Sequence, residues 1–159
     1  VYHMQLCVYV VQLTDSFQLA EDIVQDFFVA FWERKYYRAI TGNFRSYLYT
    51  SVHNAALAVL KKKKLVPVEL LTGVPVEIPQ EAVLEREELE RQEKELMLKL
   101  EKLSKQEIAA IKAVILENKK CVEAALELGM SVNTLKTHLA RALKKLRKDY
   151  HLSFLFYSF

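Results

Sequence analysis

The three prolines of the chain all lie within one short segment, LVPVELLTGVPVEIPQ, and this placement divides the 159 residues into two parts. Proline has no backbone N–H and its ring clashes with the preceding helical turn, so these positions do not suit the interior of a helix. Outside this segment the chain has no proline and only two glycines, Gly42 and Gly129, so long helices can form on both sides. We therefore expect an all-α fold in which a proline-bearing linker, residues 65–82, joins two small helical domains at residues 1–64 and 83–150.

Apolar residues recur at spacings of three and four throughout the first domain. In TDSFQLAEDIVQDFFVAFWER and again in RSYLYTSVHNAALAVLKKKK, this spacing is that of amphipathic helices. The apolar stretch VYHMQLCVYVVQL precedes both segments, so we expect a three-helix domain that ends in four consecutive lysines. We expect Phe28 and Trp32 to pack in its core, because large aromatic side chains usually do so.

The second domain is expected to contain two helices joined by a tight turn, after a long charged helix that starts near Glu81. Gly129 can adopt the left-handed conformation that ends a helix at residues 121–128. Ser131 can cap the next helix by accepting a hydrogen bond from an orphan backbone N–H. This order is typical of a helix-turn-helix. The buried stripe of the second helix is expected at Val132, Leu135, Leu139, Ala142, Leu143 and Leu146.

The opposite side of this second helix carries polar and basic residues. Short polar groups at its start can approach base edges in a major groove, and Lys and Arg near its end suit phosphates. An ordinary solvated face, or one that binds a protein, is the alternative, but the glycine turn and the serine cap together favour DNA. The candidates are Ser131, Asn133, Thr134, Lys136, Thr137, His138, Arg141, Lys144 and Lys145.

Charge is distributed in three blocks along the chain, although the net charge is only +3. Residues 1–66 carry eight Lys or Arg and five Asp or Glu, residues 67–107 carry six and eleven, and residues 108–159 carry nine and four. Two basic blocks therefore flank an acidic one. Two separate surfaces could meet a polyanion, or the charges could simply solvate helix faces.

Several classes of function find no support in the sequence. Cys7 and Cys121 are too few and too far apart for a metal cluster or a disulfide framework, and they favour a reducing, cytoplasmic location. No nucleophile and base pairing, phosphate-binding glycine loop or metal-ligand spacing occurs, so we expect no enzyme, no cofactor and no metal. The apolar tail at residues 151–159 is too short to cross a bilayer, so no membrane insertion is expected.

Three segments together carry a family resemblance. AEDIVQDFFVAFWER, NFRSYLYTSVHNAALAVLKKKK and EIAAIKAVILENKKCVEAALELGMSVNTLKTHLARALKKLR closely resemble the extracytoplasmic-function (ECF) group of bacterial RNA polymerase sigma factors, over about residues 2–150. The resemblance implies a dissociable polymerase subunit that catalyses nothing itself. Its first domain would dock on the polymerase clamp and open the minus-10 element, and its second would read the minus-35 element. Core RNA polymerase, promoter DNA and an anti-sigma factor are the implied partners.

The resemblance also implies roles for particular residues of the first domain. The clamp-facing residues would be Glu21, Asp22, Gln25 and Asp26. The residues that meet the minus-10 element would be Asn43, Arg45, Tyr47, Thr50, His53, Asn54, Lys61 and Lys62. Aromatic side chains offer unstacked bases a new surface while basic ones hold the backbone, but at helical spacing Tyr49 is expected in the core. The lysines at 61–64 would either follow phosphates or solvate a helix end.

A second hypothesis from another class remains open. The same helix-turn-helix could belong to a stand-alone transcriptional regulator that binds DNA as a dimer without core polymerase. The solution state of the protein and its footprint on a palindromic site would distinguish the two.

Overall fold

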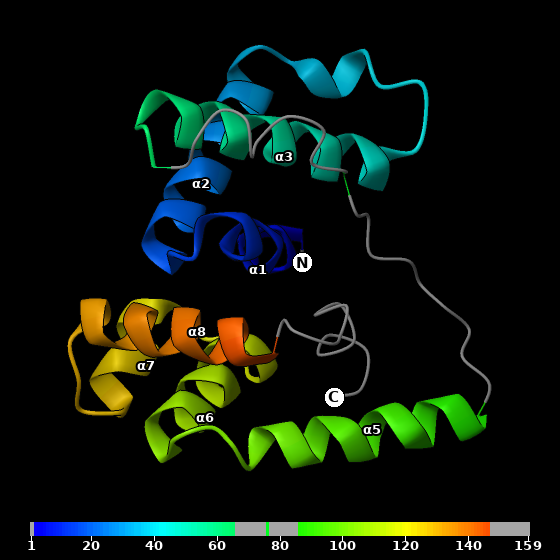
Figure 1. Ribbon diagram of the computed structural model, residues 1–159. Helices are drawn as coiled ribbons and strands as arrows, with labels where there is room; N and C mark the ends of the chain where they lie inside the picture. Colours follow the sequence, from blue (N-terminus) through cyan, green and yellow to red (C-terminus); the bar gives the residue numbers. More distant parts are fainter. Residues whose placement is uncertain (1, 66–75, 77–85, 147–159) are drawn as a thin grey trace. The chain divides into compact units, whose positions relative to one another are not determined.

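The computed structural model describes residues 2–65, 76 and 86–146 (Figure 1). These residues form helices and connecting turns, with no strand among them, which confirms the predicted all-α class. The chain splits into two compact units, Val1–Ile78 and Pro79–Phe159. The predicted linker lies outside the described residues except at positions 65 and 76, and the predicted tail lies wholly outside them.

The described residues of the first unit form three α-helices, each of which packs on the other two. They are α1 (Tyr2–Thr14), α2 (Phe17–Glu33) and α3 (Phe44–Lys62), and a 3-10 turn, η1 (Tyr36–Arg38), lies between α2 and α3. Ser16 Oγ caps α2 by accepting a hydrogen bond from the backbone N–H of Leu19. Asn43 Oδ1 caps α3 in the same way, through the N–H of Ser46 at 3.1 Å. These caps satisfy backbone donors that a helix leaves without a partner at its start.

Apolar side chains from all three helices fill the core of the first unit. Six consecutive residues of α1, from Leu6 to Val11, are buried, so this helix is enclosed on nearly all sides. Phe17, Val24 and Phe31 of α2 and Val52 and Leu60 of α3 are among the core residues that the other two helices supply. Each such side chain contributes roughly 1.5–3 kcal/mol through its removal from water.

Trp32 lies outside this core, with 62% of its surface exposed, so the prediction that it packs inside is wrong. Phe28 is only partly buried. The reason is the direction of successive side chains on a helix, which differ by about 100°. Phe31 takes the inward position at the end of α2, and Trp32 therefore points toward the surface.

The described residues of the second unit form helices that pack around α8. In order they are α5 (Arg86–Leu100), α6 (Lys105–Ile111), the π-helical turn η2 (Lys112–Leu116), α7 (Cys121–Glu127) and α8 (Val132–Leu146). Helix α8 contacts α5, α6 and α7. Its predicted stripe is confirmed: Leu135, Leu139, Ala142, Leu143 and Leu146 are buried, and Val132 is partly buried. None of the helices that the structure describes combines the length and the hydrophobicity needed to cross a lipid bilayer.

Candidate nucleic-acid interface

The turn between α7 and α8 has the geometry that its sequence predicts. Gly129 has a φ of 65°, a left-handed conformation that costs a residue with a side chain roughly 1–2 kcal/mol. The N–H of Met130 donates to the carbonyl of Ala125 at 3.0 Å, and that of Gly129 donates to Leu126 at 3.2 Å. This pair of bonds is a Schellman motif, which ends α7 and turns the chain into α8.

Ser131 caps α8, also as predicted. Its Oγ accepts a hydrogen bond from the N–H of Thr134 at 3.0 Å and lies 2.8 Å from Thr134 Oγ1. One turn further on, Thr137 Oγ1 donates to the carbonyl of Asn133 at 2.9 Å. These hydroxyls are therefore used within the helix, and they fix the side-chain directions at its start.

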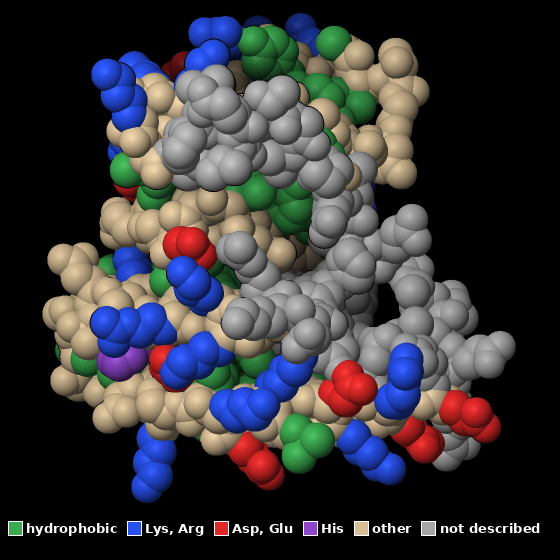
Figure 2. Space-filling model, viewed as in Figure 1, with side chains coloured by type: hydrophobic (Ala, Val, Ile, Leu, Met, Phe, Trp, Pro, Cys, Tyr) green, Lys and Arg blue, Asp and Glu red, His purple; other side chains and the backbone are tan. Residues whose placement is uncertain are grey.

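The outer face of α8 presents most of the predicted DNA-facing side chains to solvent. Figure 2 shows Lys and Arg side chains along the part of the second unit that carries α8. Lys136 and His138 are partly buried. The exposed members are Ser131, Asn133, Thr134, Thr137, Arg141, Lys144 and Lys145. Polar groups near the first turn and cations near the last give the face the graded character that the sequence indicated.

Lys145 is exposed but has a buried partner. Its Nζ lies 2.9 Å from Oε1 and 2.8 Å from Oε2 of Glu107, in the first turn of α6. Only 5% of the Glu107 side chain is exposed. Burial opposes ionisation of this carboxyl, but the hydrogen bonds from Lys145 and from the backbone of Ser104, with the charge of Lys145, outweigh it and lower the pKa of Glu107.

In the first unit, the predicted minus-10 residues are spread over the length of α3. Asn43, which precedes the helix, forms its cap, and the guanidinium of Arg45 lies 5.8 Å from the centre of the Tyr49 ring. Arg45 and Tyr47 are partly buried, and Tyr49 is in the core as expected, with 2% exposed. The remaining exposed members are Thr50, Asn54, Lys61 and Lys62.

His53 does not reach the surface, so the prediction that it contacts DNA is wrong. It is 1% exposed, and its Nδ1 lies 2.8 Å from the hydroxyl of Tyr9 on α1. His53 is one residue beyond Val52 and four beyond Tyr49, and all three belong to the face of α3 that packs inward. The side chain therefore links α1 to α3.

An exposed aromatic cluster beside α3 was missed by the sequence reasoning. The buried ring of Phe31 contacts the rings of Trp32, Tyr37, Phe44 and Tyr47, with centroids 5.6–6.1 Å away. The Trp32 and Tyr37 rings are themselves 5.3 Å apart. We call these five residues the Trp32 cluster. The signal in the sequence was the pair of tyrosines two and three residues after WER. They lie in a turn beyond the helical pattern, so that pattern assigns them no buried position.

The surface of the Trp32 cluster suits flat, unpaired rings. Trp32 is 62% exposed, Phe44 42% and Tyr37 40%. The guanidinium of Arg38 lies 5.9 Å from the centre of the Tyr37 ring, so a cation accompanies the aromatic surface. Aromatic rings next to a cation can stack bases and hold a phosphate, which is the chemistry of single-strand binding.

The predicted clamp-facing residues lie together on α2. Glu21 and Gln25, and likewise Asp22 and Asp26, are four positions apart and so share a side of the helix. Asp22, Gln25 and Asp26 are exposed, and Glu21 is partly buried. Gln25 also lines a pocket of about 590 Å³ between α1 and α2, with Tyr2, His3, Phe28 and Val29.

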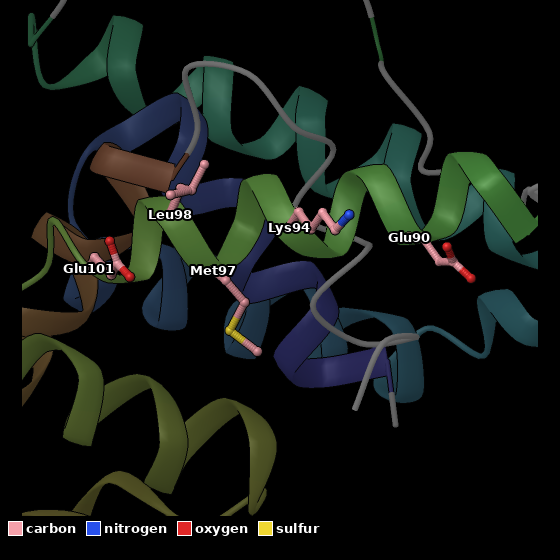
Figure 3. A pocket seen from close by; sticks show the side chains of 5 residues that line it. All are labelled: Glu90, Lys94, Met97, Leu98 and Glu101. Atoms are coloured by element: carbon pink, nitrogen blue, oxygen red, sulfur yellow. The ribbon is translucent and has the colours of Figure 1, made fainter.

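A second pocket, of about 580 Å³, has its described lining residues on α5 and in the turn that follows it (Figure 3). They are Glu90, Lys94, Met97, Leu98 and Glu101. Met97 and Leu98 are 48% and 60% exposed. A ligand site normally draws polar groups from several elements, whereas these described residues come from one helix and the turn after it. Within the described ranges no three His, Cys, Asp or Glu side chains gather as metal ligands would.

Family models match both units. The model for Sigma-70 region 2 matches residues 2–66, and that for Sigma-70, region 4 matches residues 88–146. The chain belongs to the sigma-70 family. The resemblance seen in the sequence is confirmed by this ECF-like pairing of the two regions. Members of the family are DNA-recognising transcription factors, so this sigma factor serves promoter recognition, with promoter DNA and RNA polymerase as the partners that its regions imply. No curated protein matches it.

Proposed function

We propose that this sigma factor belongs to the ECF group and directs transcription initiation by binding core RNA polymerase in the cytoplasm. Region 2 would occupy residues 1–64, region 4 residues 83–150, and the segment between them would be a linker. The observation that carries the proposal is the succession of the two family matches in one chain whose second unit has a complete helix-turn-helix. Both regions of such a protein would contact the same promoter.

Helix α8 would read the minus-35 element. Asn133, Thr134 and Lys136 lie in its first turns and would face base edges, and Arg141 and Lys144 would hold phosphates. The exposure of Asn133 and Thr134 and the cap by Ser131 support this role, because a helix enters a major groove with its first turns foremost.

Region 2 would open the minus-10 element. The Trp32 cluster would stack bases that leave the duplex, and its cation Arg38 would hold the backbone nearby. The exposed residues of α3, Thr50, Asn54, Lys61 and Lys62, would follow the same strand. The exposed aromatic rings support this proposal, since melting requires a new surface for unstacked bases.

The acidic side of α2 would dock on the polymerase clamp. Asp22, Gln25 and Asp26 are exposed there, and the apolar side chain of Val29, 54% exposed, follows one turn later. An anti-sigma factor would inhibit the protein by covering these surfaces or the face of α8.

Run-off transcription with purified core polymerase on genomic promoter fragments tests the proposal. We expect transcripts from a subset of promoters only when this sigma factor is added. The matched control is Asp22→Ala with Asp26→Ala, which should lose binding to core polymerase in a pull-down. Failure of the unaltered chain to bind core polymerase would overturn the proposal. A dimer that footprints a palindromic site without polymerase would instead support the stand-alone regulator.

A further inference from the structure

One buried carboxylate connects the start of α6 to the end of α8. The N–H of Ser104 donates to Glu107 Oε2 at 2.8 Å, and Ser104 Oγ accepts from the N–H of Glu107, which together form a capping box. The same carboxylate accepts two hydrogen bonds from Lys145 Nζ, at 2.9 and 2.8 Å. The two residues are 38 positions apart in the chain. The contact is therefore tertiary and ties two helices at one point.

This contact is costly to break because the carboxylate is buried. Glu107 is 3% exposed, and an ionised carboxylate removed from water requires a cation or several donors nearby. Lys145 supplies the cation, whereas half of its own side chain remains exposed. The preceding residue, Lys144, is exposed on the outer face of α8.

A fixed end of α8 determines where its first turn lies. Asn133 and Lys145 are twelve positions apart, roughly 18 Å of helix, so a tilt of about 10° at one end displaces the other by roughly 3 Å. A base contact requires a donor and an acceptor 2.7–3.2 Å apart, which such a displacement would break. The Glu107 contact therefore bears on recognition at the far end of the helix.

We propose that Glu107 and Lys145 are positioning residues for DNA recognition: their ion pair sets the placement of α8 on α6, and Lys145 is not a phosphate contact. The proposal rests on the proposed function, because it concerns how α8 meets the minus-35 element. Glu107 touches no DNA in this scheme. Lys145 lies among the basic residues of α8 in the sequence but acts through a residue of another helix.

A double-mutant cycle in the full chain, bound to core polymerase, tests the assignment. The readouts are the affinities for a promoter with its own minus-35 element and with a scrambled one, each measured over a range of salt concentrations. Glu107→Gln and Lys145→Gln should each reduce the preference for the matched element, by roughly tenfold, the size of one lost base contact. The double variant should lose little more than either single one, and the salt dependence should not change.

Lys144→Gln is the matched control. This variant should weaken binding to both promoters equally and lower the slope of log affinity against log salt by about 1, as expected for one phosphate contact. If Lys145→Gln behaves like Lys144→Gln and Glu107→Gln has no effect, Lys145 is a phosphate contact and the proposal is overturned.

Two conservative variants keep the test valid if a neutral variant fails to fold. Lys145→Arg retains the cation and should retain most of the preference for the matched element. Glu107→Asp retains the charge but shortens the side chain by one methylene, so it should reduce the preference while the protein still binds core polymerase. Full preference in Glu107→Asp would contradict a positioning role. If the unaltered protein does not initiate transcription, the proposed function fails instead, whatever these variants do.

Discussion

The hydroxyl of Tyr9 and Nδ1 of His53 lie 2.8 Å apart in the interior of the first unit. The contact joins α1 to α3 across 44 positions of the chain. Both side chains are largely withdrawn from solvent, so their polar atoms depend on partners inside the protein. The family resemblance assigns His53 to DNA contact. Its contact with Tyr9 shows instead that His53 stabilises the first unit.

Tyr9→Phe should lower the free energy of unfolding of the first unit by roughly 1 kcal/mol, because it removes this buried hydrogen bond. The salt dependence of promoter binding should stay the same. Urea unfolding followed by the fluorescence of Trp32, the single tryptophan, measures the effect. Tyr36→Phe is the control, since the Tyr36 hydroxyl meets Arg34 at the surface and its loss should cost little. A normal stability with a lower salt slope in Tyr9→Phe would contradict a structural role.

Trp32→Leu should impair promoter opening more than folding. Its ring is largely exposed, and a base stacked on an aromatic side chain is generally stabilised by about 1–3 kcal/mol. Permanganate reactivity of unpaired thymines in the minus-10 element, with core polymerase present, measures opening. Trp32→Tyr retains an aromatic surface and should retain most of the reactivity. Equal reactivity in Trp32→Leu and the unaltered protein would contradict a role of Trp32 in promoter opening.

The features that the sequence predicted well are those determined by nearby residues. Gly129 and Ser131 determine the turn before α8 through bonds that span at most five positions. The apolar stripe of α8 likewise follows from a fixed helical period. Such features depend little on how the rest of the chain folds, so the helix-turn-helix and the all-α class could be derived from the sequence.

The features that the sequence missed depend on contacts between distant segments. His53 is buried because α1 supplies Tyr9, and Lys145 is paired because α6 supplies Glu107. Trp32 is exposed because Phe31 takes the inward position, which periodicity alone assigns only to within one residue. Residue type and spacing cannot reveal which polar side chain has a partner 38 or 44 positions away.

Gly129→Ala should destabilise the second unit by roughly 1 kcal/mol, because alanine is strained at a φ of 65°. A Cβ would meet no atom within 4 Å there, so the cost lies in the backbone conformation and not in a clash. Gly42→Ala is the matched control: it also has open space and is not among the positive-φ residues, so it should be neutral or slightly stabilising. Thermal unfolding of both variants measures the difference. Equal effects would show that the turn does not require glycine.

Arg141→Ala and Asn133→Ala should affect DNA binding in different ways. Loss of Arg141 should weaken binding to all sequences about equally and reduce the salt slope by about 1, since phosphates carry no sequence information. Loss of Asn133 should change the preferred base at one position of the minus-35 element, by about 1–3 kcal/mol. Binding to a set of single-base variants of the promoter at two salt concentrations measures both effects. A uniform loss from both changes would contradict the graded face of α8.

Acid should destabilise the second unit through Glu107. Lys145 and Ser104 together lower the pKa of this carboxyl in the folded protein, despite its burial. A group with a lowered folded pKa adds stability that is complete above its unfolded pKa, near 4.3, and is lost as the pH falls through the folded value. Glu107→Gln removes the ionisable group, so this pH dependence should disappear, and the variant should be less stable at neutral pH by about 2 kcal/mol.

Urea unfolding followed by amide resonances of α6 and α8, from neutral pH to about pH 2, measures both expectations. Glu101→Gln, in the exposed turn after α5, makes the same change of charge and should retain the acid sensitivity, because Glu107 and its partners remain in place. An unchanged acid sensitivity in Glu107→Gln would show that the ion pair with Lys145 contributes nothing to the stability of the second unit.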